Sequence, residues 1–216
     1  PVLELFPKLG ETNFTSHIAA IQQAKPDLLM CSFWSGDATI FMKQAAAVGL
    51  LKSMKGVFTT AGGVHDSLKK DFTPEGLLLG YNSMYFDDPK ASALLKQFVQ
   101  EYKAKHNEYP PYECDHAYFC VESYRAAVEK AYQGAGQWPS KAQVVKALEG
   151  IEVESLSGKR SWREDHIQTC DFYQGITTHK NAYDFATISP VEVISTKQAM
   201  KPPGTKLFDW IGSWKV

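Results

Sequence analysis

Long apolar runs and an excess of positive charge are both missing from this sequence. No stretch approaches the roughly 20 consecutive apolar residues that a helix needs to cross a bilayer. The 216 residues include 23 lysines and arginines against 24 aspartates and glutamates, which gives a formal net charge of -1. Nucleic-acid-binding domains carry a basic patch or stripe, and no such pattern is present. We therefore expect a chain that does not span a membrane and does not bind nucleic acid.

Cysteine is scarce, and its spacing does not fit a metal site. The four cysteines form no C-x-x-C pair and follow no metal-ligand spacing, so we expect no zinc site. We expect no other metal and no cofactor. Cys31 lies in an apolar run and fits a small buried side chain. Cys170 could pair with Cys114 or Cys120 in an oxidising compartment, and spacing alone does not choose between them.

The chain begins at Pro1, with no initiating methionine and no visible signal peptide. We interpret such a start as the mark of a processed or cut chain, so the missing signal peptide says nothing about export. With 216 residues and 44% hydrophobic content, the chain can bury the core of one large domain or two small ones.

Residues 2–82 alternate short apolar runs with helical patterns. The order predicts β-α-β-α-β-α-β, that is, a parallel sheet flanked by helices with right-handed crossovers. The run at 28–33 is almost continuously apolar, which is typical of a strand covered on both faces. The predicted strands are 3–6, 28–33, one within "GVFTTAGG" and 77–81; the predicted helices are 15–24, 37–49 and 66–70.

From residue 88 the pattern becomes helical. Two long amphipathic helices are predicted, and a third follows Pro139 over 140–148. Short β-prone runs come next, and the residues after 195 show no clear period, so we expect a tail in which Trp210 and Trp214 pack. The apolar side of the second long helix is formed by Ala117, Val121, Tyr124, Val128 and Ala131; the β-prone runs are 151–153, 172–177 and 191–194.

The stretch "CSFWSGDATIFMKQAAAVGL" at 31–50 joins a strand end, a small polar turn and a helix. Ligands of parallel α/β sheets sit beyond the carboxyl ends of the strands, where the next helix presents unpaired N–H groups. Trp34 and the turn at 35–37 occupy this place, and Gly62 and Gly63 form a second strand-end loop. The alternative is that Ser35 or Asp37 only caps the helix and Trp34 fills a gap.

Patterns typical of enzymes are weak, and we expect no catalytic residues. "SLKK" at 67–70 fits S-x-x-K, but the companion motifs of acyl-enzyme formers are missing. His116 and Cys120 share one helical face, which is more often packing than a nucleophile and its base. "REDH" at 163–166, with His179 nearby in sequence, is better explained by a solvated turn with an Arg–Asp ion pair than by a ligand or metal site.

Three stretches carry a resemblance to a known family. They are "TNFTSHIAAIQQAKPDLLMCSFWSGDATIFMKQAAAVGL", "TPEGLLLGYNSMYFDDPKASALLKQFVQEYKAKHNEYPPYECDHAYFCVESYRAAVEKAYQGAG" and "GKRSWREDHIQTCDFYQGIT". Over most of residues 1–195 the chain resembles the substrate-binding proteins of branched-chain amino acid type ABC transporters, which are type I periplasmic binding proteins. The resemblance lies in the order of the elements more than in any single motif.

The resemblance implies two α/β, Rossmann-like lobes that close over a small ligand. Residues 1–82 resemble the later α/β part of the second lobe, and 83–156 resemble the helical return into the first lobe. Residues 157–195 resemble closing strands shared between the lobes, and 196–216 form a tail without a clear counterpart. The family's opening half has no counterpart here, so we expect a chain truncated at its N-terminus.

The resemblance also implies the ligand contacts, with an aromatic side chain at Trp34 packing over the ligand. Where amino acid-binding members carry a carboxylate for the ligand ammonium, this chain has Gly62. Either Asp37 or Asp66 replaces that carboxylate, or the ligand is a carboxylated aromatic, an amide or a urea-like solute. The expected ligand-binding residues are Trp34, Ser35, Gly36, Asp37, Ala61, Gly62, Gly63 and His65.

The implied function is the solute-binding component of an ABC importer, not an enzyme. Such a protein is exported to the periplasm, holds a small amino acid, aromatic carboxylate or amide in an interlobe cleft, and passes it to an ABC permease. The alternative is a ligand-sensing regulator or receptor domain of the same fold. The absence of an attached DNA-binding or membrane segment in this sequence favours transport.

Overall fold

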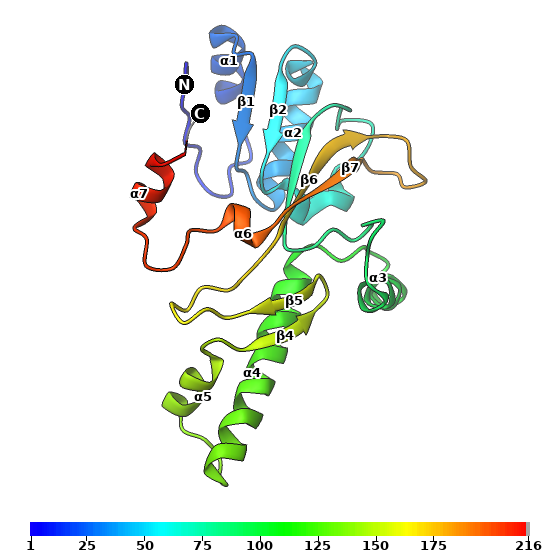
Figure 1. Cartoon of the computed structure of the whole chain (residues 1–216). Helices are drawn as coiled ribbons and strands as arrows, with labels where there is room; N and C mark the ends of the chain where they lie inside the picture. Colours follow the sequence, from blue (N-terminus) through cyan, green and yellow to red (C-terminus); the bar gives the residue numbers. More distant parts are fainter. Residues whose placement is uncertain (215–216) are drawn as a thin grey trace.

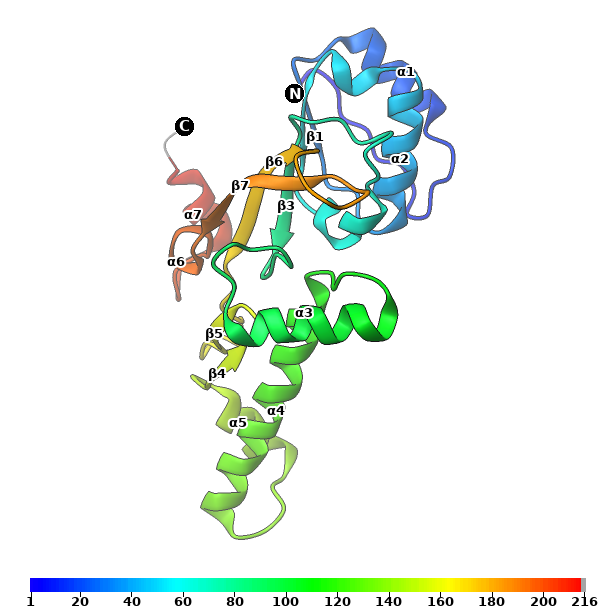
Figure 2. The ribbon, with the colours of Figure 1, turned by 90° about the vertical axis from the view of Figure 1, so that its right-hand side faces the viewer.

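The computed structural model describes residues 1–214 and shows two parts of different character (Figure 1). One part holds the main sheet with α1 and α2, and the other is a helical arm, residues 93–161, that extends away from the sheet. Figure 2 shows the same separation from the side, with α3 lying across the junction. The residues that connect the two parts therefore lie next to the carboxyl ends of the first strands.

Three parallel strands form one half of the main sheet, as the alternating pattern predicts. β1 (Leu28–Cys31) pairs with β2 (Lys55–Phe58), which pairs with β3 (Leu78–Asn82). β6 (Phe172–Thr178) lies antiparallel to β3, and β7 (Thr187–Ile194) lies antiparallel to β6, so the order is β1-β2-β3-β6-β7. The predicted α/β class is confirmed, and the sheet is mixed because β6 runs opposite to the other four strands.

Aromatic side chains join the helices to the sheet. Phe41 of α2 contacts Phe14 before α1 and Phe58 of β2, with ring centroids 5.5 and 6.4 Å apart, and all three rings are buried. Large rings removed from water in this way supply much of the core's stability. The helices of this part are α1 (Thr15–Ala24), α2 (Gly36–Ala47) and the 3-10 helices η1 (Leu50–Lys52) and η2 (Ala61–Ser67).

The prediction of a strand at 3–6 is wrong, and so is the prediction that β1 is covered on both faces. Residues 1–8 form no strand, and Phe6 is 88% exposed. Leu28 and Met30 of β1 are exposed as well, beside a groove of about 450 Å³ lined by the N-terminal segment and β1. The segment lies along β1 without the ladder hydrogen bonds that define a strand, because apolar composition alone does not supply a pairing partner.

The helical arm begins and ends its helices at recognisable caps. Ser92 accepts a hydrogen bond from the backbone N–H of Leu95, and Ser140 forms a capping box with Gln143. Among residues 1–214, no helix combines the length and the apolar character that crossing a membrane requires. The elements are α3 (Ala93–His106), α4 (Glu113–Ala135), α5 (Lys141–Leu148) and the antiparallel pair β4 (Glu152–Ser155) and β5 (Gly158–Ser161).

The side of α4 that the sequence predicts as buried is largely exposed. Val121 is 65% exposed and Tyr124 is exposed too, whereas Phe119 and Ala127 on another side of the helix are buried. Phe119 packs against Trp162, and Ala127 packs in a small cluster with α5. The prediction of a helix is confirmed, but among the described residues only the end of the stripe, at Ala131, packs against other side chains of the arm.

The tail also differs from its prediction, because it contains two short helices. α6 (Thr196–Ala199) is tied to the sheet by Thr196, whose N–H and hydroxyl donate to Asp171. α7 (Leu207–Gly212) carries Trp210, which contacts Trp214 at 4.8 Å between ring centroids. The two tryptophans pack on each other, and Trp214 stays exposed.

Two connections between the sheet and the arm run side by side. One leaves the sheet after Asn82 and the other returns before Phe172, and these residues are partners in the β3–β6 ladder. Beyond the ladder, the backbone N–H of Ser83 donates to the carbonyl of Asp171 at 3.0 Å. The junction between the sheet and the arm is therefore formed by two chain segments that are hydrogen-bonded to each other.

Candidate functional site

The loops that follow β1 and β2 lie together at the carboxyl ends of these strands. The Thr60 hydroxyl donates to the carbonyl of Phe33 at 2.7 Å, and the N–H of Thr59 donates to the carbonyl of Cys31 at 3.2 Å. Adjacent parallel strands end at the same edge, so the two loops predicted from the sequence form one surface. This surface is the candidate site.

The first turn of α4 reaches the same surface. Trp34 Nε1 donates to Glu113 Oε1 at 3.3 Å, although the two residues are 79 positions apart. A Cβ at Gly63 would lie 2.6 Å from the same carboxylate oxygen, so the Glu113 side chain in this position lies directly against Gly63. We call Trp34, Thr60, Gly63 and Glu113 the strand-end site. These residues supply, in that order, a half-exposed indole, a hydroxyl, a backbone without a side chain and a carboxylate.

The turn after Trp34 has an unusual backbone. Ser35 has φ 55° and ψ -141°, a conformation that a residue with a Cβ adopts at a cost of about 1–3 kcal/mol. Neither Ser35 nor Asp37 caps α2 with its side chain. Asp37 Oδ2 instead accepts from the N–H of Gly10 at 3.0 Å, which fixes the N-terminal segment to the start of α2. Gly36 is exposed beside Trp34.

The remaining predicted residues of the second loop face the protein interior. Ala61, Gly62 and His65 are buried, and a Cβ at Gly62 would lie 2.4 Å from Tyr81 Cδ1. His65 Nδ1 is 3.0 Å from the carbonyl of Gly62, and its ring stacks on Phe86 at 4.5 Å. Burial lowers the pKa of His65 despite this hydrogen bond, so the ring stays neutral. These residues lie on the interior side of the loop and hold its backbone in position.

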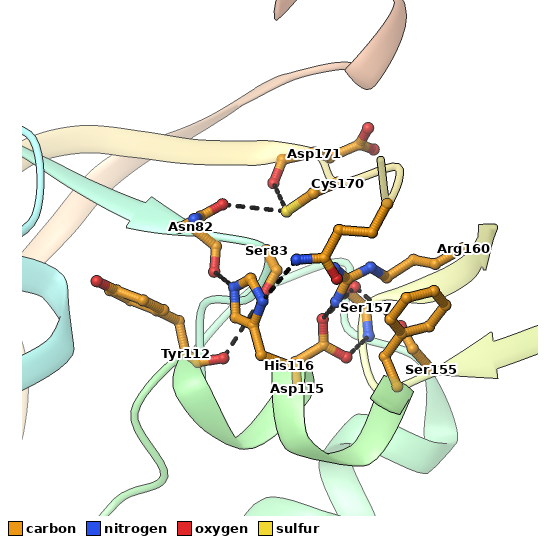
Figure 3. Close-up of polar contacts among 12 residues, drawn as sticks. Asn82, Ser83, Tyr112, Asp115, His116, Ser155, Ser157, Arg160, Cys170 and Asp171 are labelled. Carbon is orange, nitrogen blue, oxygen red and sulfur yellow. Dashed lines mark hydrogen bonds and ion pairs between the residues drawn. The ribbon is translucent and has the colours of Figure 1, made fainter. Parts of the chain in front are cut away.

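A buried ion pair fixes the first turn of α4 against the arm's hairpin. Arg160 Nη1 of β5 lies 2.7 Å from Asp115 Oδ2, with side-chain exposures of 4% and 0% (Figure 3). Ser157 donates to the same carboxylate through its N–H and its hydroxyl. The Arg160 guanidinium also donates to the carbonyl of Thr169 and to Gln168 Oε1. Each nitrogen of the guanidinium and each oxygen of the carboxylate thereby has a partner, which offsets the cost of burying the two charges.

His116 extends this network to the end of β3. Its Nε2 lies 3.3 Å from the carbonyl of Asn82, and its Nδ1 lies 3.3 Å from Gln168 Nε2 (Figure 3). Burial lowers the pKa of His116, and the Arg160 charge lowers it further. Cys170 Sγ is 3.1 Å from Asn82 Oδ1, and each of the four cysteines is a free thiol. We call Asn82, Asp115, His116, Ser157, Arg160 and Gln168 the junction cluster.

The enzyme-like patterns do not assemble into catalytic groups. His116 is engaged by the junction cluster, while Cys120 on the same helix is exposed. Lys70 Nζ donates to the carbonyl of Asn181. Arg163 and Asp165 form an ion pair inside the "REDH" turn, which confirms the structural interpretation of that motif.

Sequence reasoning missed Glu113 and the pair of Asp115 with Arg160. Glu113 and Asp115 carry only one local signal, since acidic residues are common in the first turn of a helix. Their partners lie far away in sequence, and no local pattern joins them. The sequence could identify the strand-end loops but not the helix that faces them.

Comparison with solved structures shows the same fold in a set of solute-binding proteins. An amino acid ABC transporter substrate-binding protein from Pseudomonas fluorescens Pf-5 matches with a TM-score of 0.66 and 22% identity, covering 86% of this chain and 49% of that one. A leucine-, isoleucine-, valine-, threonine- and alanine-binding protein from Brucella ovis matches with a TM-score of 0.70 and 20% identity, covering 89% and 49%.

A solute-binding protein of an ABC transporter from Rhodopseudomonas palustris BisB5, solved with 3,4-dihydroxybenzoic acid, matches with a TM-score of 0.67 and 22% identity, covering 89% and 50%. The chain therefore spans about half the length of these proteins. A search of curated protein sequences finds no match. The profile of the periplasmic binding protein family matches residues 2–176. This chain, with its parallel strands ending at a shared loop surface, belongs to the periplasmic binding protein family.

Proposed function

We propose that this chain supplies one wall of the solute-binding cleft of an ABC importer's binding protein. The observation that carries the proposal is the strand-end site, where Trp34 and Gly63 from two neighbouring strand ends meet Glu113 of α4. A binding cleft gains affinity from apolar contact and selectivity from a few placed polar groups. The half-exposed Trp34 offers the apolar surface, and the loop backbone and Glu113 offer the polar groups.

The two predicted loops have different parts in this proposal. Trp34 and the exposed turn at Ser35 and Gly36 face the solute, while Asp37 anchors the start of α2. In the second loop Gly63 lies at the surface, and Ala61, Gly62 and His65 hold the loop in place from the core. The strained backbone of Ser35 supports the assignment, because strain of this kind clusters at ligand sites.

The relatives that share the fold support a proposed class of solute. The names of the matched proteins include amino acids and aromatic acids as ligands. We propose a small amino acid, aromatic carboxylate or amide, bound without chemical change in the periplasm and released to an ABC permease. The alternative is a sensor of the same fold, and permease and ATPase genes beside this protein's gene would favour the importer.

The test is a thermal-shift screen of the protein produced from its complete reading frame. A ligand that binds only the folded state raises the melting temperature by mass action. The probes are L-amino acids, benzoate, hydroxybenzoates and small amides. We expect one class to raise the melting temperature and Trp34→Ala to abolish the shift, while Trp138→Ala, which removes an exposed tryptophan far from the site, leaves it unchanged. Equal shifts in both variants, or no shift with any probe, would refute the proposal.

A further inference from the structure

The His116 imidazole of α4 is in contact with both connections between the sheet and the arm. Its Nε2 lies 3.3 Å from the carbonyl of Asn82, the last residue of β3, where one connection begins (Figure 3). Its Nδ1 lies 3.3 Å from Nε2 of Gln168, which belongs to the connection that returns to β6. One ring therefore holds the first turn of α4 against both connections.

The two ends of this chain of hydrogen bonds determine where its protons lie. The Arg160 guanidinium has donors only, so Gln168 Oε1, 2.8 Å from Arg160 Nη2, is the acceptor and the amide turns its Nε2 toward the ring. Nδ1 of His116 must then accept from Gln168. A backbone carbonyl only accepts, so Nε2 of His116 carries the ring proton that is donated to Asn82. The arrangement therefore requires a neutral His116 in the Nε2–H tautomer.

A second ring proton does not fit this chain. It would lie on Nδ1 and face the amide N–H of Gln168, so that two donors point at each other. Rotating the amide by half a turn moves the same conflict to Arg160, which the buried carboxylate of Asp115 holds in place. In either case protonation of His116 costs the junction at least one hydrogen bond.

The surroundings of the ring also disfavour its charged form. Burial lowers the pKa of His116, and the positive charge of Arg160 lowers it further. The Asn82 carbonyl and the carboxylates of Asp115 and Glu113 act in the opposite direction, yet the pKa stays below its ordinary value of 6.5. The other groups near the ring are uncharged around neutral pH: the amide of Gln168, the Tyr112 hydroxyl, whose pKa burial raises to about 12, and the Cys170 thiol beside Asn82, whose pKa burial raises to about 11.

We infer that His116 is a proton-sensitive switch at the junction: the neutral ring holds the arm to the sheet, and the protonated ring releases the returning connection and loosens the arm. The inference goes beyond the proposed function, because it concerns the attachment of the two parts and not the solute. The first turn of α4 also carries Glu113, which contacts Trp34. Acid would therefore disturb the strand-end site together with the junction.

Two substitutions distinguish a switch from a histidine that only packs. Gln168→Glu supplies a carboxylate that accepts from both Arg160 and the protonated ring, so the conflict between donors disappears. His116→Gln keeps an N–H that can donate to the Asn82 carbonyl, and its amide does not titrate. Gln137→Glu adds the same negative charge at an exposed position beyond the other end of α4 and serves as the control.

Nitrogen-15 NMR spectra of the histidines, recorded on the protein from its complete reading frame, report the tautomer and the pKa of His116. We expect the Nε2–H tautomer in the wild type. Gln168→Glu should raise the pKa of His116 by about 1–3 pH units, the usual effect of an adjacent opposite charge, and Gln137→Glu should leave it unchanged. An Nδ1–H tautomer, or an unchanged pKa in Gln168→Glu, would refute the chain of hydrogen bonds.

Hydrogen–deuterium exchange at about pH 8 and about pH 5, corrected for the intrinsic effect of pH, reports the release itself. In the wild type and in Gln137→Glu, the protection of residues 162–171 should fall about threefold to tenfold at the lower pH, the effect of one lost hydrogen bond. The fall should be absent in His116→Gln and in Gln168→Glu. Equal protection at both pH values in the wild type, or the same fall in His116→Gln, would overturn the inference and would leave the proposed solute binding untouched.

Discussion

Replacing Arg160 by methionine is expected to destabilise the protein strongly, because it leaves the Asp115 carboxylate buried without its cation. The two side chains are 4% and 0% exposed, so water cannot replace the lost partner. Removing one member of a buried ion pair costs about 3–5 kcal/mol. Methionine also gives up the donation to the carbonyl of Thr169 and the stacking of the guanidinium over Phe119 at 4.4 Å.

For a domain of this size, each kcal/mol corresponds to about 2–4 °C in melting temperature, so Arg160→Met should lower it by about 6–20 °C. The measurement is thermal denaturation followed by circular dichroism on the protein from its complete reading frame. Arg125→Met is the control, because Arg125 pairs with Glu122 and Glu129 on the exposed surface of α4 with 57% of its side chain exposed. An exposed pair contributes at most about 1 kcal/mol, so this variant should change little.

The double variant Asp115→Leu with Arg160→Met tests the cause of the loss. Removing both charges leaves no unpaired ion, so the double variant should lose at least about 2 kcal/mol less than the sum of the two single variants. The reasoning is refuted if Arg160→Met is as mild as Arg125→Met. It is also refuted if the two single losses simply add.

Three further outcomes are expected. Ser35→Gly should raise the free energy of unfolding by about 1 kcal/mol in urea denaturation, since glycine adopts a φ of 55° without strain; a loss would contradict this. Gly62→Ala should cost about 1–3 kcal/mol, because its Cβ would lie 2.4 Å from Tyr81 Cδ1, whereas Gly134→Ala, with open space around it in α4, should not destabilise. Because burial lowers the pKa of His65, the unfolded chain binds the extra proton first, so the melting temperature should fall as the pH drops below about 6.5. His65→Phe should reduce this slope, and an unchanged slope would show that other groups cause it.

The parallel strands and their helices were predictable because local patterns determine them. The apolar run after Asp27, the glycine after α2 and the serine caps of α3 and α5 each act within a few residues. The position of Trp34 followed from the same patterns, since a parallel strand followed by a helix leaves its turn at the carboxyl edge of the sheet. The loops of the strand-end site were therefore visible in the sequence.

The errors concern features that depend on distant partners. An apolar segment at 3–6 becomes a strand only when a neighbouring strand forms backbone hydrogen bonds with it. Among the described residues no strand pairs with this segment. The stripe with Val121 and Tyr124 has the period of a buried helix face, but period does not reveal what covers the face. Glu113 reaches Trp34 across 79 positions, a separation at which one sequence carries no signal.

The paired connections at the junction have a mechanical consequence. Asn82 and Phe172 share a ladder, and the bond from Ser83 to Asp171 continues it, so the two segments form one narrow ribbon between the sheet and the arm. These backbone hydrogen bonds prevent the two segments from sliding past each other. Bending the pair out of the plane of the sheet breaks none of these bonds. Any displacement of the arm relative to the sheet therefore carries both connections together, in one register.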